Sequence, residues 1–130
     1  KLLKLSKTRT KINLYLSKKH RPIFSNSDES NLDELTYLIK QLSEISNKNN
    51  AEFYFVYLPE FARYVLNYNQ TNYKNIKFIL KKLDIPIIDI HKKIFLKQND
   101  PLDLFPFRSD GHYTAEGYKK ISEVVYNFTK

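Results

Sequence analysis

Two short runs of apolar, β-favouring residues constrain the fold of this chain more than any other feature of its 130 residues. The first run spans residues 53–58 and stops at Pro59, and the second spans residues 86–90. Neither run alternates between apolar and polar residues, which is typical of strands buried on both faces of a parallel sheet. A helically spaced stripe from Tyr73 to Leu83 separates them, so the order predicts an α/β layer fold with right-handed crossovers.

Apolar residues with helical spacing predict two more helices. One stripe runs from Leu32 to Ile45 and ends at the polar segment 47–50, and the other runs from Tyr118 to Phe128 behind a capping Thr114. Residues 97–113 are predicted to be irregular. Two strands are too few for a complete sheet, so we expect the remaining strands in a part of the protein outside this chain. The initial Lys and the absence of Met favour a fragment of a longer reading frame.

Composition excludes several classes of function. The chain has only two glycines, Gly111 and Gly117, so neither the dinucleotide-binding G-x-G-x-x-G motif nor a Walker-type phosphate loop can be present. The absence of Cys excludes disulfides, thiolate zinc sites and a cysteine nucleophile. No apolar run approaches the roughly 20 residues of a membrane-spanning helix, and no signal peptide is present, so the localisation stays open.

The net charge of +8 belongs to one end of the chain. Residues 1–21 carry eight Lys and Arg and no acid, while the other 14 basic residues balance the 14 acidic ones. The apolar spacing within residues 1–21 predicts a basic amphipathic helical arm before a domain of residues 22–130. We favour a solvated helix that packs on the domain. Binding of lipid or nucleic acid by this arm, with Tyr64, Tyr68 and Tyr73 as stacking rings, is a less favoured alternative.

The densest group of polar residues spans residues 108–117 and includes both glycines. Asp110 precedes His112 by two residues on a loop that Gly111 frees, so the carboxylate can turn back and accept the Nδ1 proton of the imidazole. His112 would then act as a general base. Gly117 is expected in the first turn of the last helix, where its presence favours close approach of another segment.

The run Ser109-Asp110-Gly111-His112-Tyr113-Thr114-Ala115-Glu116-Gly117-Tyr118, followed by an amphipathic helix, resembles the last sequence block of SGNH hydrolases, the GDSL esterase and lipase superfamily. The resemblance covers roughly residues 32–130. It implies a flavodoxin-like three-layer α/β/α sandwich with a short parallel sheet, here in part. It also implies that His112 is the base and Asp110 the orienting carboxylate of a Ser-His-Asp triad.

The family's N-terminal Gly-Asp-Ser block and its later Gly-x-Asn block are absent, because neither glycine of this chain has the required neighbours. No nucleophile is therefore assigned. We expect a fragment of an ester hydrolase that is inactive alone and needs no cofactor. The Asp-x-His spacing is closer to that of SGNH-like acetyltransferases, so an O-acyltransferase is the alternative. The expected substrate is a small-molecule or carbohydrate ester, and self-association could cover the incomplete sheet.

Three other residues are candidates for lining the substrate site: Tyr57, Glu60 and Arg108. Arg108 could bind an anionic group of the substrate, or it could neutralise the negative charge of Asp103 or Asp110. For Glu60 and Arg63 the default expectation is a solvated ion pair at a helix start.

A metal site is a further alternative, because Asp89 and His91 repeat the Asp-x-His spacing of Asp110 and His112. Glu60 or water would complete its ligand shell. Neighbouring Lys92 disfavours a cation there, so we expect no metal.

Overall fold

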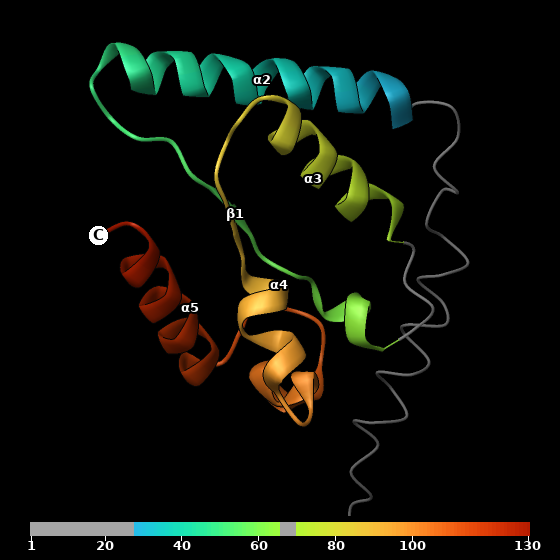
Figure 1. Cartoon of the computed structure of the whole chain (residues 1–130). Helices are drawn as coiled ribbons and strands as arrows, with labels where there is room; N and C mark the ends of the chain where they lie inside the picture. Colours follow the sequence, from blue (N-terminus) through green and yellow to red (C-terminus); the bar gives the residue numbers. More distant parts are fainter. Residues whose placement is uncertain (1–27, 66–69) are drawn as a thin grey trace, which may run out of the picture. The chain divides into compact units, whose positions relative to one another are not determined.

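The computed structural model describes residues 28–65 and 70–130 (Figure 1). The chain divides into two compact units, residues 1–33 and 34–130. Only the start of helix α2 (Asp28–Lys48) is described in the first unit. The predicted basic arm of residues 1–21 and the candidate stacking residue Tyr68 therefore lie outside the described residues, and the fold is given for the second unit.

The sheet of the second unit contains two parallel strands, β1 (Phe55–Tyr57) and β2 (Ile87–Asp89), within the part of the chain that the structure describes. Helix α3 (Thr71–Lys82) connects them, and the register places Tyr57 beside Asp89. The predicted order of strand, helix and strand is confirmed, and with it an α/β fold with a parallel sheet. Both strands are shorter than the apolar runs that contain them.

Helices cover both faces of this sheet. Alternation of side chains along the strands places Phe55 and Ile87 on one face, where they pack around buried Ile39 of α2 and Leu80 of α3. On the other face, the ring of Tyr54 contacts Phe128 edge to face, with centroids 5.8 Å apart. Phe128 ends helix α5 (Ala115–Phe128), so α3 and α5 lie on opposite sides of β1 (Figure 1).

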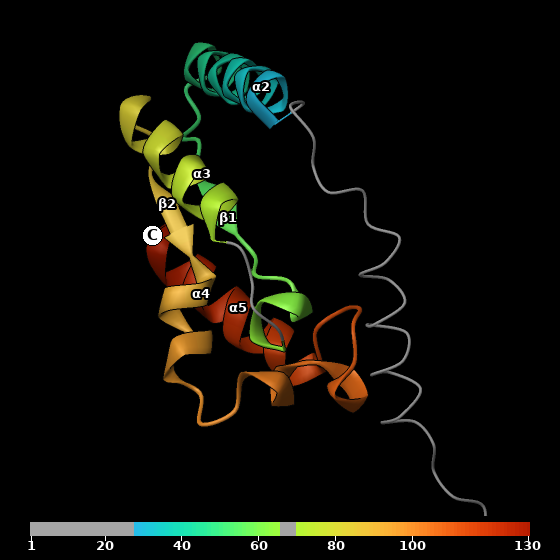
Figure 2. The same ribbon diagram turned by 90° about the vertical axis from the view of Figure 1, so that its right-hand side faces the viewer.

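The second strand ends earlier than predicted. Residue Ile90, expected to extend the strand, instead begins the short helix α4 (Ile90–Lys93), and Figure 2 shows β2 running directly into it. Asp89 is the cause, because its Oδ1 accepts a 3.1 Å hydrogen bond from the Lys92 backbone N–H and so caps the helix. The same carboxylate that interrupts the apolar run thus terminates the strand.

Residues 95–108 contain three single-turn 3₁₀ helices, η2 (Phe95–Lys97), η3 (Pro101–Leu104) and η4 (Pro106–Arg108). The last two lie within residues 97–113, where the sequence predicted irregular structure. Aromatic rings hold this segment on the unit. Phe95 and Phe105 are almost fully buried, and Phe105 contacts Phe61 of the turn η1 (Phe61–Tyr64). None of the helices in the described ranges is long and apolar enough to cross a membrane.

Candidate functional site

The predicted pair Asp110 and His112 lies on the loop before α5, and both residues are exposed. Gly111 between them has a φ of 144°, a conformation that residues with a side chain rarely adopt. This agrees with the prediction that a glycine is needed here for the path of the loop backbone. Among the described residues, no hydrogen bond joins the side chains of Asp110 and His112. The structure therefore brings the two groups to one loop without assembling them into an oriented pair.

Tyr113 fixes this loop to the carboxyl end of β1. Its hydroxyl donates a 2.5 Å hydrogen bond to the carbonyl of Pro59, and its ring contacts the buried rings of Phe95 and Phe105. Burial raises the pKa of the Tyr113 phenol, which keeps the proton needed for this bond. The backbone that carries His112 is therefore tied through Tyr113 to the segment that follows β1, and in parallel α/β folds ligands bind at the carboxyl ends of the strands.

The first turn of α5 is packed closely against the preceding segment. Thr114 caps the helix, because its Oγ1 accepts a 3.0 Å hydrogen bond from the Gly117 N–H. A Cβ on Gly117 would lie 3.0 Å from Cβ of Tyr113 and 3.2 Å from the carbonyl oxygen of Leu104. That carbonyl already accepts a 2.9 Å hydrogen bond from the Thr114 N–H. The predicted cap at Thr114 and the predicted close approach at Gly117 are both confirmed.

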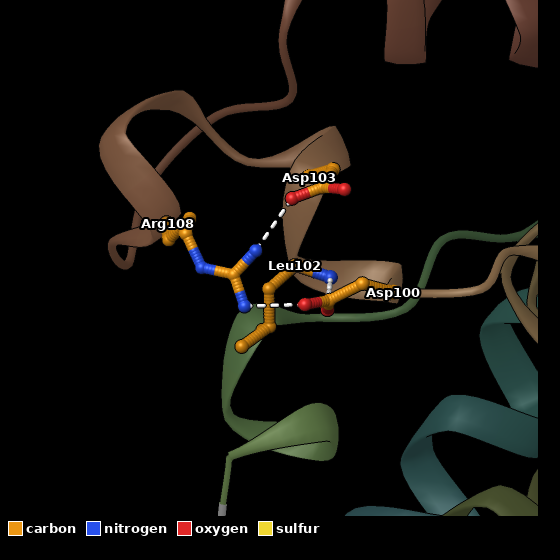
Figure 3. Close-up of polar contacts among 4 residues, drawn as sticks. All are labelled: Asp100, Leu102, Asp103 and Arg108. Carbon is orange, nitrogen blue, oxygen red and sulfur yellow. Dashed lines mark hydrogen bonds and ion pairs between the residues drawn. The ribbon is translucent and has the colours of Figure 1, made fainter.

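Arg108, a candidate for binding an anionic substrate group, is instead paired within its own loop. Its guanidinium donates a 2.5 Å hydrogen bond to Oδ1 of Asp103 and another to Oδ2 of Asp100, as Figure 3 shows. Arg108, followed by the Leu102 N–H, lowers the pKa of Asp100. Of the two partners anticipated from the sequence, the structure supports Asp103. The guanidinium thus bridges two carboxylates of its own loop, with one hydrogen bond to each.

The other two substrate-lining candidates differ in their surroundings. Glu60 is exposed, whereas Tyr57 is half-buried and its hydroxyl accepts a 3.2 Å hydrogen bond from Nη1 of Arg63. Arg63 is only 9% exposed and lies 4.4 Å from the ring centroid of Tyr73. The expected solvated ion pair of Arg63 is therefore wrong. Aromatic rings on β1 and α3 bury the guanidinium and replace water around it.

A buried polar cluster at the ends of the strands was not predicted. Its centre is Asp89, which is 6% exposed and accepts a 2.5 Å hydrogen bond from the Tyr73 hydroxyl. The ammonium of Lys77 lies 3.9 Å from the same carboxylate oxygen. A carboxylate inside an otherwise apolar run is the signal that could have located this cluster, since a charged group is buried only when it is partnered.

His91 joins the same region through Tyr64, whose hydroxyl lies 2.9 Å from Nδ1 of the imidazole. Burial and then the charge of Arg63 lower the pKa of His91, and burial raises the pKa of Tyr64. Both shifts favour the neutral groups, so the phenol donates and Nδ1 accepts. His91 is thus a hydrogen-bonded half-buried imidazole, in contrast to exposed His112.

The metal alternative gains no support from these positions. Within residues 28–65 and 70–130, no group of three or more His, Asp and Glu side chains is arranged to hold a metal ion. Asp89 is engaged by Tyr73 and the Lys92 N–H, and Nδ1 of His91 is engaged by Tyr64. The two residues that the metal alternative needs as ligands thus form hydrogen bonds within the fold.

Comparisons with known proteins gave no relatives for this chain. No family model matches it, and neither curated proteins nor solved structures include a match. What the site can do is therefore argued from its own geometry.

Proposed function

We propose that this chain carries the base and the orienting carboxylate of an SGNH-type serine ester hydrolase, whose complete domain is a flavodoxin-like three-layer sandwich. One observation carries the proposal. The loop that carries exposed His112 is tied, through the adjacent Tyr113, to the carbonyl of Pro59, two residues after the end of strand β1. Substrates of parallel α/β proteins bind at that end of the sheet.

In this reaction His112 removes the proton of a serine hydroxyl as its oxygen attacks the ester carbonyl, and then returns that proton to the leaving alcohol. A water molecule completes the cycle by hydrolysing the acyl-enzyme, again with His112 as the base. Asp110 accepts the Nδ1 proton and stabilises the imidazolium. This requires the carboxylate to turn toward the ring, and Gly111 between the two residues, which has no side chain, allows the backbone to rotate.

The serine nucleophile is proposed to come from another part of the parent protein. In the described ranges, no hydroxyl group is hydrogen-bonded to His112. The 130-residue chain is accordingly expected to hydrolyse esters at a negligible rate. Strands from the parent, or from a second copy of the chain, would extend the two-stranded sheet.

The test uses the complete gene product that contains this chain, with p-nitrophenyl acetate as the substrate. His112→Ala and Asp110→Asn are expected to lower kcat/KM about 10³-fold or more. Glu123→Gln removes an exposed carboxylate from α5 and His91→Gln removes the other described imidazole, so both serve as controls that keep activity. Full activity in His112→Ala would refute the proposal.

Two further measurements define the reaction. Turnover by the 130-residue chain alone, abolished by His112→Ala, would show that the nucleophile lies within this chain. Analysis of products in the presence of a sugar alcohol distinguishes hydrolysis from the alternative, O-acyl transfer, because a transferase forms a new ester in place of free acetate.

A further inference from the structure

Three cationic side chains from three different elements gather around the buried carboxylate of Asp89. The ammonium of Lys77 in α3 lies 3.9 Å from Oδ2 of Asp89 and 5.1 Å from the ring centroid of Tyr73. The guanidinium carbon of Arg63 in η1 lies 4.4 Å from the same centroid. Lys92 in α4 is the third cation, since burial and then its adjacent ammonium lower the pKa of Lys77. We call these three residues the cationic cluster.

The charges at this place do not balance. After burial, the charges that act on His91 are those of the whole cluster, which lower its pKa, and that of Asp89, which alone raises it. Three positive charges thus face one negative charge. Two like charges held beside each other in partly buried positions repel, and an opposite charge between them relieves that repulsion.

The chain has no other carboxylate to supply that opposite charge. Among the described residues, the ion pair with Asp89 is the only one that either Lys77 or Lys92 forms. Residues 1–27 and 66–69, which the structure does not describe, contain neither Asp nor Glu. A compensating anion therefore has to come from outside this chain.

The cluster is placed where a ligand can reach it. Tyr57 and Asp89 end the two parallel strands, and ligands of such folds bind at the carboxyl ends of the strands. The side chain of Lys77 is 33% exposed and Lys92 is exposed. Asp89, in contrast, is buried and already hydrogen-bonded, so an anion arriving from solvent meets the two ammonium groups rather than the carboxylate.

The size of the charge excess indicates the class of anion. Two uncompensated positive charges match one dianion, whereas a single carboxylate would neutralise only half of the excess. A phosphate dianion also presents several acceptor oxygens, so both ammonium groups can donate to it at once. Arg63 is only 9% exposed and contributes through its charge.

We propose that Lys77 and Lys92, supported by the charge of Arg63, bind a phosphate dianion, either free or as the monoester group of a small molecule. The site uses neither Asp110 nor His112 and does not depend on the proposed function. His112→Ala should leave phosphate binding intact.

The experiment titrates the 130-residue chain with inorganic phosphate and, separately, with glycerol 3-phosphate, and follows ¹H–¹⁵N NMR spectra at constant ionic strength. Saturable shifts are expected around residues 77 and 92, and the tighter ligand shows whether the free ion or the monoester is preferred. Lys92→Gln should weaken binding on the order of tenfold. Because Lys92 is exposed, this change leaves the fold intact, and Lys92→Arg should retain binding.

Lys93→Gln is the matched control for Lys92→Gln. It removes the same charge from the next residue of α4, but its ammonium lies over the ring of Phe128, 5.1 Å from the centroid. Lys82→Gln, at an exposed position of α3, is the control for Lys77→Gln. Both control variants should bind phosphate within about twofold of the unaltered chain, since charges distant from the anion are screened.

Several results would overturn the proposal. One is the absence of saturable shifts with both ligands, and another is equal weakening by Lys92→Gln and Lys93→Gln, which would show that only net charge matters. Acetate binding as tightly as phosphate would contradict a dianion site, and tighter binding of a single-stranded oligonucleotide through Lys92 would indicate a nucleic-acid surface. Loss of phosphate binding in the complete gene product would show that another segment supplies the missing negative charge.

The two proposals fail separately. Hydrolysis of p-nitrophenyl acetate, a neutral ester, should be unchanged in Lys92→Gln. Phosphate binding through Lys92 in a gene product without esterase activity would refute the proposed function alone. Esterase activity that depends on His112, in a chain that does not bind phosphate, would refute the phosphate site alone.

Discussion

The hydroxyl of Tyr73 donates a 2.5 Å hydrogen bond to Oδ2 of Asp89, joining helix α3 to the end of strand β2. The other oxygen of Asp89 caps α4 through the Lys92 N–H. One buried carboxylate thus connects three elements of the second unit. A buried charge that is fully hydrogen-bonded tolerates the loss of a partner poorly.

Tyr73→Phe is therefore expected to lower the free energy of unfolding by about 1–3 kcal/mol, because the Asp89 carboxylate loses a donor that water cannot readily replace. Urea unfolding followed by circular dichroism measures the change. Tyr37→Phe is the matched control, since the Tyr37 side chain is 62% exposed, and its effect should stay within about 0.5 kcal/mol. Equal effects of the two substitutions would contradict the assignment.

His91 predicts a specific dependence of stability on pH. Burial, followed by the charge of Arg63, lowers the pKa of His91 in the folded chain, while the unfolded chain binds a proton near pH 6.5. Between pH 7 and pH 5 the unfolded state consequently holds more protons, so the free energy of unfolding falls as the pH falls. Solvent screening of the partly exposed ring keeps the slope well under about 1.4 kcal/mol per pH unit.

His91→Gln should flatten this dependence, since the glutamine oxygen can still accept from Tyr64 but cannot titrate. Urea midpoints collected at intervals from pH 7 to pH 5 measure the effect. Ser122→Ala serves as the control and should keep the original slope, because it replaces an exposed side chain and removes no titratable group. A slope unchanged in His91→Gln would assign the pH dependence to other groups.

Gly117→Ala tests the packing at the start of α5. Alanine gains about 1 kcal/mol in helix propensity, but its Cβ meets the Tyr113 Cβ at 3.0 Å and the Leu104 carbonyl at 3.2 Å. Both neighbours are fixed by hydrogen bonds, so we expect a net loss of roughly 1 kcal/mol. The pair Glu123→Gly and Glu123→Ala, at an exposed position of the same helix, gives the propensity difference between glycine and alanine without the contact. A gain in thermal stability for Gly117→Ala would show that the loop yields.

Phe107 of η4 has a left-handed φ of 55° and is 99% exposed. Phe107→Gly should raise the free energy of unfolding by about 1 kcal/mol, because glycine removes the cost of the left-handed backbone and almost no buried surface is lost. Asn50→Gly is the comparison, since Asn50 also has a positive φ of 54° but asparagine tolerates it better. Its gain should be smaller. If Phe107→Gly instead destabilises the chain, the ring contributes to folding and is not merely displayed.

The sequence predicts the parallel strands, the helices α3 and α5, the Thr114 cap and the crowding at Gly117, because each depends on local pattern or backbone geometry. It does not predict that Arg63 is buried, since this depends on how β1 and α3 fold back to place the rings of Tyr57 and Tyr73 against the guanidinium. The role of Asp89 was missed for a related reason. An aspartate in an apolar run can either end a strand or cap the following helix. The bonds that Asp89 accepts from Tyr73 of α3 and from the Lys92 N–H are seen only in the folded chain.

The hydrogen bond from Tyr113 to Pro59 joins residues 54 positions apart. Closing so long a segment has an entropic cost that local helices avoid, so we expect this contact to form late when the chain folds. We then expect the loop that carries Asp110 and His112 to open locally, and native-state hydrogen exchange should detect this opening below the free energy of global unfolding. Any activity of this loop would be lost on mild heating before the helical signal changes.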